Sequence, residues 1–542
     1  MTRTGVGLWG ARMAAPSISE ITSVLLYDEG NAWSGSQITF SFPRAGSTWP
    51  TYAVDDEQAN ADYGTVTDAQ AAAIRLALQA WDKVIAPSLV ETDDVANTGQ
   101  IRIAFTDVND VTGNEDTTAF AYRPPQPGFA QGPWQGDVWL DETLKTSNFA
   151  PSSAGFETVL HELGHALGLQ HPFGPGAILP AGYDNVRYTV MAYDYPQDTY
   201  HVTIEPVDGV NRLLGRPVSP TTPMVFDIAA LQARYGADPT TGLGDTTYTW
   251  SQATPILQAV YDAGGTDTFD LSTHSRSSII DLTPGAYSSI AYYSAQAQAD
   301  YWSAIYPNSA AAITEFIIDP ETYTWSDNLG IAYATVIENV LGGSATDTIL
   351  GNDAPNHLNG GGGNDFLRGF LGDDSIVGGA GFDDTHGNQG NDSVRGGDGP
   401  DGVVGGQGNA MLYGEAGDDL VYGNLGADTQ EGGDGVDWVR GGQANDSLSG
   451  GAGDDWMSGD LGDDTLSGGL GADTFRTWGG TGIDRITDFS RAQGDRVQLD
   501  VGTGASASQV GADTVIDMVG GGKMILVGVS MASLDGAWIF AA

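Results

Sequence analysis

Residues 450–476 read GGAGDDWMSGDLGDDTLSGGLGADTFR and contain three copies of one nine-residue unit. Each copy begins with Gly, has Asp at its sixth position and an apolar residue at its eighth. Fifteen copies follow one another without insertion or deletion from Gly342 to Arg476. All fifteen begin with Gly, and thirteen have the sixth-position Asp. A flexible glycine-rich linker has no reason to keep apolar residues in register in this way, so the pattern predicts regular structure.

The repeat predicts a solenoid in which each unit forms one turn and one short strand. Glycine supplies the left-handed turn conformations, and the eighth-position side chain points inward. Turn carbonyls and sixth-position carboxylates converge on Ca²⁺, and neighbouring coils share each ion. We therefore expect several bound Ca²⁺ ions and a segment that is unfolded without them. The expected calcium ligands are Asp347, Asp365, Asp374, Asp383, Asp392, Asp401, Asp419, Asp428, Asp437, Asp446, Asp455, Asp464 and Asp473.

The nonapeptide resembles the repeats-in-toxin, or RTX, family, whose repeats form a calcium-binding parallel β-roll. This resemblance implies a protein that leaves the cell unfolded through the type I secretion machinery and folds in extracellular calcium. Secretion of this kind uses an uncleaved C-terminal signal, and the chain ends in SLDGAWIFAA, which resembles such a signal only loosely. The first twenty residues lack the apolar core of a signal peptide, so we expect a secreted, extracellular protein exported by the C-terminal route.

Composition excludes several classes of partner. The chain has 21 Lys and Arg against 70 Asp and Glu, a formal net charge of -49, which would repel nucleic acids and anionic membranes. It has no Cys, which excludes disulfides, thiolate nucleophiles and zinc fingers. No apolar run approaches the length needed to span a membrane. We expect no nucleic-acid partner, no transmembrane segment and a monomer.

A second motif, outside the repeats, carries the chemistry. Residues 155–171 read GFETVLHELGHALGLQH, with apolar residues at the spacing of a helix that is buried on one side. His161 and His165 are four residues apart and therefore lie on the same helix face, where they can bind one metal ion. Gly168 then ends the helix and allows a left-handed turn, which returns the chain so that His171 supplies a third imidazole.

Three histidine ligands with an open fourth position are typical of a catalytic zinc site rather than a structural one. Glu162 lies next to His161, so its carboxylate can reach an attacking water and act as general base. A helix with incidental histidines is the alternative interpretation, but three of the chain's seven histidines fall within the eleven residues from His161 to His171. The motif therefore predicts one catalytic Zn²⁺ and metal-assisted hydrolysis of amide bonds in protein or peptide substrates.

The full motif H-E-x-x-H-x-x-G-x-x-H resembles the metzincins, which add a tight turn containing a Met beneath the zinc. Met191 stands in the sequence TVMAY, twenty residues after the third histidine. In the serralysin and astacin families the residue matching Tyr193 is an additional zinc ligand that can swing away and stabilise the oxyanion. Pro172 directly follows His171, as in serralysins. The resemblance implies a serralysin-type zinc metalloendopeptidase.

The predicted fold class is a multidomain α+β protein with five parts. Residues 1–30 form a short pro-segment removed by autolysis, and 31–245 form the metzincin catalytic domain, a mixed sheet with long helices. Residues 246–341 form a β-rich connecting region with an insertion at 286–328. Residues 342–476 form the all-β parallel roll, and 477–542 form a β cap that contains the secretion signal. Within the catalytic domain, residues 119–122 and 136–140 resemble the strands that lead to the active-site helix, and an edge strand there is expected to hold peptide substrate.

Two other functions are compatible with parts of this pattern. The chain could be a calcium-ordered surface or adhesion protein with a vestigial protease domain, but a vestigial domain has no need of Glu162. A zinc hydrolase acting on lipid or sugar is less supported, because no G-x-S-x-G motif is evident. The repeats are irregular at Thr385, Ala410 and Gln430, where we expect weakened calcium sites or a break in the roll.

Overall fold

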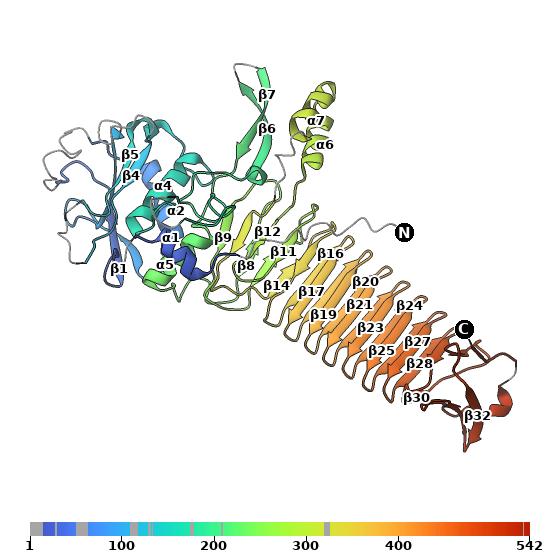
Figure 1. Ribbon diagram of the computed structural model, residues 1–542. Helices are drawn as coiled ribbons and strands as arrows, with labels where there is room; N and C mark the ends of the chain where they lie inside the picture. The colour runs from blue at the N-terminus through green and yellow to red at the C-terminus, as the bar shows by residue number, and fades with distance from the viewer. Residues whose placement is uncertain are drawn as a thin grey trace. The chain divides into compact units, whose positions relative to one another are not determined.

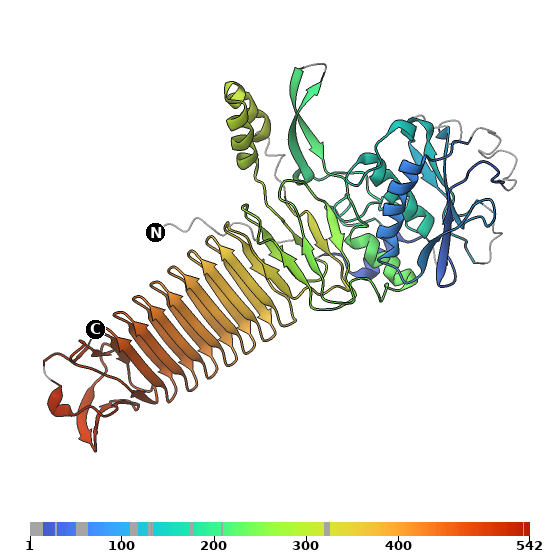
Figure 2. The ribbon, with the colours of Figure 1, turned by 180° about the vertical axis from the view of Figure 1, so that it is seen from behind.

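The computed structural model describes residues 15–541 except 28–29, 50–62, 109–116, 128–131, 133, 174–177, 208–209, 319–325 and 535. The chain divides into two compact units. Unit 1 comprises Met1–Leu243, Pro255–Ala263 and Ser294–Thr335, and unit 2 comprises Gly244–Thr254, Gly264–Tyr293 and Val336–Ala542. Unit 1 combines a sheet with helices, whereas unit 2 consists almost entirely of strands (Figures 1 and 2). The predicted fold class is confirmed.

Unit 1 contains a five-stranded sheet in which all strands are parallel except one. The exception is the strand at the edge, β4, which pairs antiparallel with β5. This edge position is the one that was expected for a strand that holds peptide substrate. In sheet order the strands are β2 (Ser88–Glu91), β1 (Gln37–Ser41), β3 (Ile101–Thr106), β5 (Val138–Asp141) and β4 (Ala119–Ala121).

Three helices pack around the core of unit 1: α2 (Asp68–Asp82), α4 (Ala154–Leu167) and α5 (Val225–Tyr235). A capping box between Thr67 and Gln70 starts α2, and the apolar face of this helix is buried. Helix α4 contains the histidine motif and lies against α2 and β4. Among the described residues, no helix is long and apolar enough to cross a membrane.

A further helix, α1 (Ile18–Leu25), lies in the segment predicted to be a pro-segment. Its apolar residues, Ile21, Val24 and Leu25, are buried, and it contacts α5. The side chain of Gln170 donates hydrogen bonds to the carbonyl oxygens of Val24 and Leu26, at 2.8 and 3.1 Å. Residues 16–26 are therefore built into unit 1, while residues 1–14 of the predicted pro-segment lie outside the described residues.

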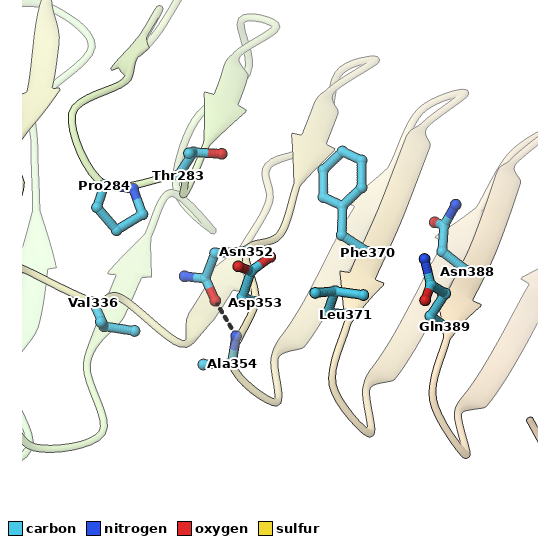
Figure 3. Close-up of a pocket in the computed structure, with 10 residues that line it drawn as sticks. All are labelled: Thr283, Pro284, Val336, Asn352, Asp353, Ala354, Phe370, Leu371, Asn388 and Gln389. Atoms are coloured by element: carbon cyan, nitrogen blue, oxygen red, sulfur yellow. Dashed lines mark hydrogen bonds between the residues drawn. The ribbon is translucent and has the colours of Figure 1, made fainter. Parts of the chain in front are cut away.

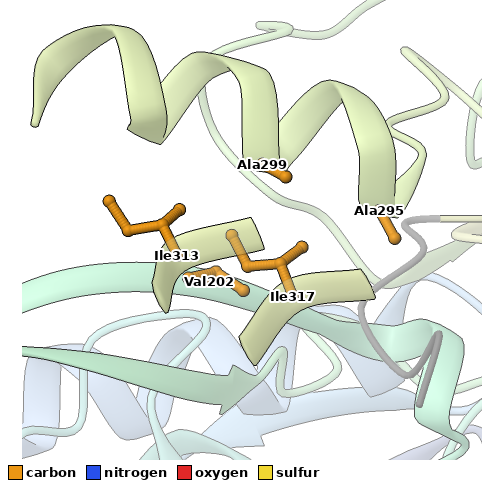
Figure 4. Close-up of a cluster of buried hydrophobic side chains, with 5 residues drawn as sticks. All are labelled: Val202, Ala295, Ala299, Ile313 and Ile317. Atoms are coloured by element: carbon orange, nitrogen blue, oxygen red, sulfur yellow. The ribbon is translucent and has the colours of Figure 1, made fainter. Parts of the chain in front are cut away.

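The predicted insertion at 286–328 forms α6 (Ala295–Ile305) and α7 (Ala310–Ile318). These helices pack against a hairpin of β6 (Tyr200–Val207) and β7 (Val210–Pro217). Val202 on β6 contacts the apolar side chains of both helices (Figure 4). The backbone N–H of Val202 also donates to the amide oxygen of Gln298. The insertion is thus anchored to the catalytic unit by a small apolar cluster, whose members are Val202, Ala295, Ala299, Ile313 and Ile317.

Unit 2 is a roll of two sheets, which we call the β16 sheet and the β17 sheet, and their strands are parallel except at the end of the β16 sheet, where β33 pairs antiparallel with β34 and β32. Consecutive strands alternate between the sheets, so neighbours within one sheet are 18 residues apart (Figure 1). The β16 sheet contains β8 (Thr247–Thr249), β10 (Thr268–Asp270), β14 (Asn339–Leu341), β16 (His357–Gly362), β18 (Ser375–Ala380), β20 (Ser393–Asp398), β22 (Met411–Ala416), β24 (Thr429–Asp434), β26 (Ser447–Ala452), β28 (Thr465–Leu470), β30 (Ile483–Ile486), β34 (Lys523–Leu526), β33 (Asp513–Met518) and β32 (Ala505–Val510). The β17 sheet contains β11 (Ile279–Asp281), β15 (Thr348–Leu350), β17 (Phe366–Leu371), β19 (Asp384–Gln389), β21 (Gly402–Gln407), β23 (Leu420–Leu425), β25 (Trp438–Gln443), β27 (Trp456–Leu461), β29 (Thr474–Thr477), β31 (Arg496–Leu499) and β35 (Ile539–Ala541).

The eighth-position side chains fill the space between the two sheets. They are buried, as predicted, and the two polar exceptions, Thr385 and Gln430, are buried as well. Strand pairing continues in unbroken register past Thr385, Ala410 and Gln430, so the roll has no break at these repeats. The Gln430 amide is poorly accommodated, because its Nε2 reaches Gly441 O only at 3.4 Å and its Oε1 has no partner among the described residues.

The poorly hydrogen-bonded Gln430 amide gives a test of the packing between the two sheets. We predict that Gln430→Leu raises the free energy of unfolding of the calcium-loaded protein by about 1–2 kcal/mol, because a buried oxygen without a donor is removed. Urea unfolding at saturating Ca²⁺ measures the change. Leu448→Gln, which places an amide on the neighbouring coil of the same column, is the matched control and should destabilise the roll. An unchanged or lower stability for Gln430→Leu would contradict the interpretation that the eighth-position side chains form the apolar core between the two sheets.

Candidate metal centres

The first centre is formed by three imidazoles at the end of α4. His161 and His165 lie one turn apart on the helix, and Gly168, with φ +108°, ends it in a left-handed cap. The returning chain brings His171 opposite the helix, where its Nε2 lies 3.1 Å from the Nε2 atoms of both His161 and His165. The structure therefore brings together the three histidines that the motif predicts.

The outer nitrogens of the two helical histidines are held by backbone carbonyls. His161 Nδ1 lies 2.8 Å from Val190 O, and His165 Nδ1 lies 2.8 Å from Leu169 O. A carbonyl can only accept, so each Nδ1 carries the proton and each Nε2 directs a lone pair inward. Burial lowers the pKa of His161 to about 4 and also lowers that of His165, which keeps both rings neutral. Converging neutral imidazoles repel one another unless a cation lies between them, and this donor set suits Zn²⁺.

Two further predicted residues border the imidazoles. Glu162 is almost fully buried, its Oε2 has no hydrogen-bond partner among the described residues, and burial raises its pKa to about 8. The hydroxyl of Tyr193 lies 2.9 Å from His171 Nε2, although its ring is largely exposed. Burial of the hydroxyl and the nearby Glu162 charge raise the pKa of Tyr193 to about 12. The Tyr193 ring also packs beside the rings of His161 and His171, with centroids 5.4 and 5.1 Å away, so its hydroxyl lies close to the ligand atoms.

Met191, the predicted methionine of the tight turn, is fully buried. It packs against α4 at Gly164, where an added Cβ would lie only 2.6 Å from the Met191 Sδ atom. A larger residue at position 164 would therefore push the methionine away from the helix. The glycine inside the histidine motif thus has a packing role that the motif alone does not reveal.

Asp227 is a functional residue that the sequence analysis did not single out. Its fully buried carboxylate accepts hydrogen bonds from Thr189 Oγ1 at 2.6 Å and from the N–H groups of Val190 and Met224 at 2.8 and 2.9 Å. Burial raises its pKa to about 7 despite these three donors. The carboxylate clamps α5 to the turn that carries Met191 and the Val190 carbonyl. Its signal in the sequence is a lone charge in the apolar run VFDIAAL.

The second group of centres is a ladder of buried carboxylates in the roll. In all the repeat aspartates except Asp347, Oδ1 accepts the backbone N–H of the residue 18 positions earlier, for example Asp365 N to Asp383 Oδ1 at 2.7 Å. The other oxygen, Oδ2, is buried and has no partner among the described residues. Carboxylate oxygens left in this way suit Ca²⁺. The aspartates that share this arrangement are Asp365, Asp374, Asp383, Asp392, Asp401, Asp419, Asp428, Asp437, Asp446, Asp455, Asp464 and Asp473.

Both ends of this ladder differ from the expected ligand set. Asp347, a predicted ligand, has both oxygens occupied by backbone donors, Ser278 N at 2.6 Å and Gly343 N at 2.9 Å. At the other end, Asp484 continues the ladder beyond the fifteen repeats, because its Oδ1 is buried without a partner among the described residues. Burial and the neighbouring Asp464 raise the pKa of Asp484 to about 8. A two-residue shift after Arg476 places Asp484 outside the nine-residue count.

Two repeats lack the carboxylate. Asn356 satisfies itself with protein partners, since its Oδ1 accepts from Asn352 N at 2.8 Å and its Nδ2 donates to Glu338 O at 3.1 Å. Ala410 has only its backbone N–H, which donates to Asp428 Oδ1 at 2.8 Å. These coils keep the backbone pattern of the roll but offer no side-chain ligand.

Comparison with known proteins agrees with both groups of centres. The Matrixin family model matches residues 47–220, the model of the Peptidase M10 serralysin C terminal matches 226–296, and the RTX calcium-binding nonapeptide repeat matches overlapping segments within 341–486.

Curated relatives cover part of the chain. A serralysin of Photorhabdus laumondii is 30% identical over 315 residues, covering 54% of this chain and 55% of the relative. Serralysin C of Dickeya chrysanthemi is 31% identical over 344 residues, covering 59% and 61%. The chain thus matches between half and two thirds of the length of these relatives. An extracellular lipase structure from Serratia marcescens aligns to 40% of this chain and 44% of its own at 19% identity, with a TM-score of 0.15, which supports no conclusion.

The Asp227 clamp predicts a measurable change in metal affinity. In Asp227→Asn one of the three donors loses its acceptor, so we expect zinc affinity to fall about 10–100-fold and the thermal midpoint to drop. Competition with a chromogenic chelator measures the affinity. Asp68→Asn, an exposed position at the start of α2, is the control and should leave affinity unchanged. Unaltered zinc affinity in Asp227→Asn would show that the clamp does not position the ligands.

The carboxylate ladder predicts an unusual dependence on pH. Burial raises the pKa of Asp365 and Asp455 to about 7 and that of Asp446 to about 8, above the value of about 3.9 in the unfolded chain. The folded state thus binds protons more tightly, so the calcium-free roll should gain stability as pH falls from about 8 to 4. Far-ultraviolet circular dichroism after calcium removal should show increasing β-structure over this range. The calcium-loaded roll should lose stability instead, because protons compete with Ca²⁺; identical pH trends in both states would contradict the assignment.

Proposed function

We propose, from the premise that this chain is a serralysin-type member of the M10 peptidases with RTX calcium-binding repeats, that it is a secreted, zinc-dependent endopeptidase ordered by calcium. The observation that carries the proposal is the group of three inward-facing Nε2 lone pairs beside a buried carboxylate that has no partner among the described residues. The substrates are proteins or peptides.

The metal ligands of the proposed enzyme are His161, His165 and His171, with Tyr193 as an additional ligand. Zinc, when bound there, supplies Lewis acidity toward a water molecule and the scissile carbonyl. Glu162 lies beside the His161 ligand, and its buried carboxylate, when ionised, is suited to accept a proton from the attacking water and to pass it to the leaving amine. The Tyr193 hydroxyl, protonated at neutral pH, is suited to donate a hydrogen bond to the developing oxyanion.

The edge strand β4 is the proposed substrate platform. It lies against α4 and is the terminal strand of its sheet, so its outer backbone groups can pair with an extended peptide. Main-chain pairing of this kind holds many sequences in one orientation. Part of the loop between His171 and Met191, residues 174–177, lies outside the described residues, and the natural substrate is not assigned.

Folding and export are proposed to be linked through calcium. The ladder of buried carboxylates disfavours a folded roll where calcium is scarce, which suits passage through the type I secretion machinery and folding outside the cell. We infer that any pro-segment removed by autolysis ends before Pro16, because α1 is part of the packed catalytic unit. The carboxyl-terminal secretion signal includes residues 535 and 542, which lie outside the described residues.

Replacing Glu162 tests the proposed base directly. We predict that Glu162→Ala retains the fold and one bound zinc but loses about 10²–10⁴-fold in casein hydrolysis, the range that general acid–base catalysis contributes. Glu142→Ala removes an exposed carboxylate of the same unit and should keep full activity. Zinc content from elemental analysis and fluorescent-casein cleavage in Ca²⁺ are the two measurements. Residual turnover within tenfold of the original protein would refute the role of Glu162.

A further inference from the structure

The outer face of the β17 sheet carries a pattern that the roll itself does not require. Along each strand, alternate side chains face inward and outward, so three outward positions of successive strands form columns along the roll. On β23, β25 and β27 the first column is Leu420, Trp438 and Trp456, the second is Tyr422, Arg440 and Ser458, and the third is Asn424, Gly442 and Asp460. The Trp438 and Trp456 rings stack with centroids 5.0 Å apart.

On three neighbouring strands of the β16 sheet the equivalent positions are polar and small, whereas β22 of that sheet presents Met411 and Tyr413 outward. The three strands, β24, β26 and β28, obey the same inward requirements for calcium and apolar packing, yet they present no aromatic side chain outward. Their outward residues are Thr429, Glu431, Gly433, Ser447, Ser449, Gly451, Thr465, Ser467 and Gly469. Outward aromatic residues are therefore not required on every strand of the roll, and they occur where cavities lie, Tyr422 and Trp478 at one and Tyr413 at another.

A cavity of about 240 Å³ lies in this outer face, and we call it the outer groove. Tyr422 and Trp478 supply aromatic walls, and Asn424, Arg440 and Asp460 supply polar groups. The Arg440 guanidinium lies 5.0 Å from the Tyr422 ring centroid and pairs with Asp460 at 2.6 Å. Its Nε–H is buried and has no acceptor among the described residues. The site thus offers flat apolar surfaces beside a donor that still needs an acceptor.

Backbone strain marks the same positions. Asn424 and Asp460 have φ of +77° and +67°, a left-handed conformation that glycine adopts more easily. Phe370 and Asn388 occupy the same column on β17 and β19, with φ of +78° and +79°, and line a second cavity of about 760 Å³ (Figure 3). Strain of this kind persists where a side chain serves a purpose other than stability. In the β17 sheet, each of these strained side chains borders a cavity.

We propose that the outer groove binds a neutral polysaccharide. The apolar C–H faces of sugar rings match the exposed faces of Tyr422 and Trp478, and sugar hydroxyls match the amide, guanidinium and carboxylate groups between them. The columns run from coil to coil, so a ligand that follows them is extended rather than compact. This surface lies outside the proposed peptidase chemistry and adds a binding function to the roll.

Other occupants fit the groove less well. A peptide would seek a free strand edge, but β23, β25 and β27 are each paired on both sides. A nucleic acid or an acidic polysaccharide would be repelled, because residues 342–476 contain 24 acidic residues against four arginines, and Arg440 is already paired with Asp460. A neutral polymer avoids both difficulties.

Affinity electrophoresis of the full-length, calcium-loaded protein tests the proposal. The neutral probes are xyloglucan, galactomannan, glucomannan and dextran in the gel, with pull-down on cellulose and chitin, and alginate is the anionic probe. We expect retardation by at least one neutral probe, no retardation by alginate, and cellulose or chitin binding that is unchanged between 50 and about 500 mM NaCl. No interaction with any neutral probe would overturn the proposal, as would binding to alginate that disappears with salt.

Two variants separate binding from stability. Tyr422→Ala should weaken binding about tenfold or more, whereas Phe382→Ala, which removes an exposed aromatic side chain of the roll outside the outer groove, should not. Asn424→Gly should weaken binding while leaving stability equal or higher, because glycine relieves the left-handed strain. Equal loss of binding in the Tyr422 and Phe382 variants would overturn the proposal. Concentration-dependent self-association that Tyr422→Ala abolishes would also overturn it, because the groove would then join copies of this chain.

Discussion

Lone pairs that face no hydrogen-bond donor inside the protein are the constraint on which both units depend. At the end of α4 three Nε2 atoms converge, and in the roll a row of Oδ2 atoms lies buried without partners among the described residues. Unpartnered polar atoms are costly in an interior, and clustered ones of like charge are costlier still. Metal ions resolve both situations, zinc through neutral nitrogen ligands and calcium through hard oxygen ligands. We therefore expect each unit to be most stable with its cations bound.

The same buried groups connect stability with function. In the catalytic unit, carbonyl oxygens orient the imidazoles, and Asp227 clamps the turn that provides one of these carbonyls. In the roll, one oxygen of each aspartate joins neighbouring coils and leaves the other for the ion. Because the inward side chains supply both the carboxylates and the apolar packing between the sheets, the outward side chains can vary without disturbing the roll. The outer groove lies at such outward positions, where side chains are not needed for the ladder or for the apolar packing between the sheets.

Much of this arrangement could be predicted from the sequence because short, regular spacings determine it. A four-residue spacing sets His161 and His165 on one face, and a nine-residue spacing sets the repeat aspartates at equivalent positions of successive turns. Features that depend on contacts between distant segments were not predictable in this way. The pairing of Asp347 with Ser278, the clamp by Asp227 and the place of Asp484 after a two-residue shift are of this kind. The outer groove was not predicted either, because its columns join residues 18 positions apart, in every second repeat, whereas the sequence pattern was followed at nine-residue spacing.

Anomalous diffraction from crystals grown with Ca²⁺ and Zn²⁺ tests the central claim most directly, because it locates each metal independently of activity. The account predicts one zinc peak about 2.0–2.1 Å from the Nε2 atoms of His161, His165 and His171. It also predicts calcium peaks about 2.3–2.6 Å from the Oδ2 atoms of the ladder, from Asp365 to Asp473. Absence of zinc between the imidazoles, or a folded roll whose carboxylates bind no cation, would contradict it.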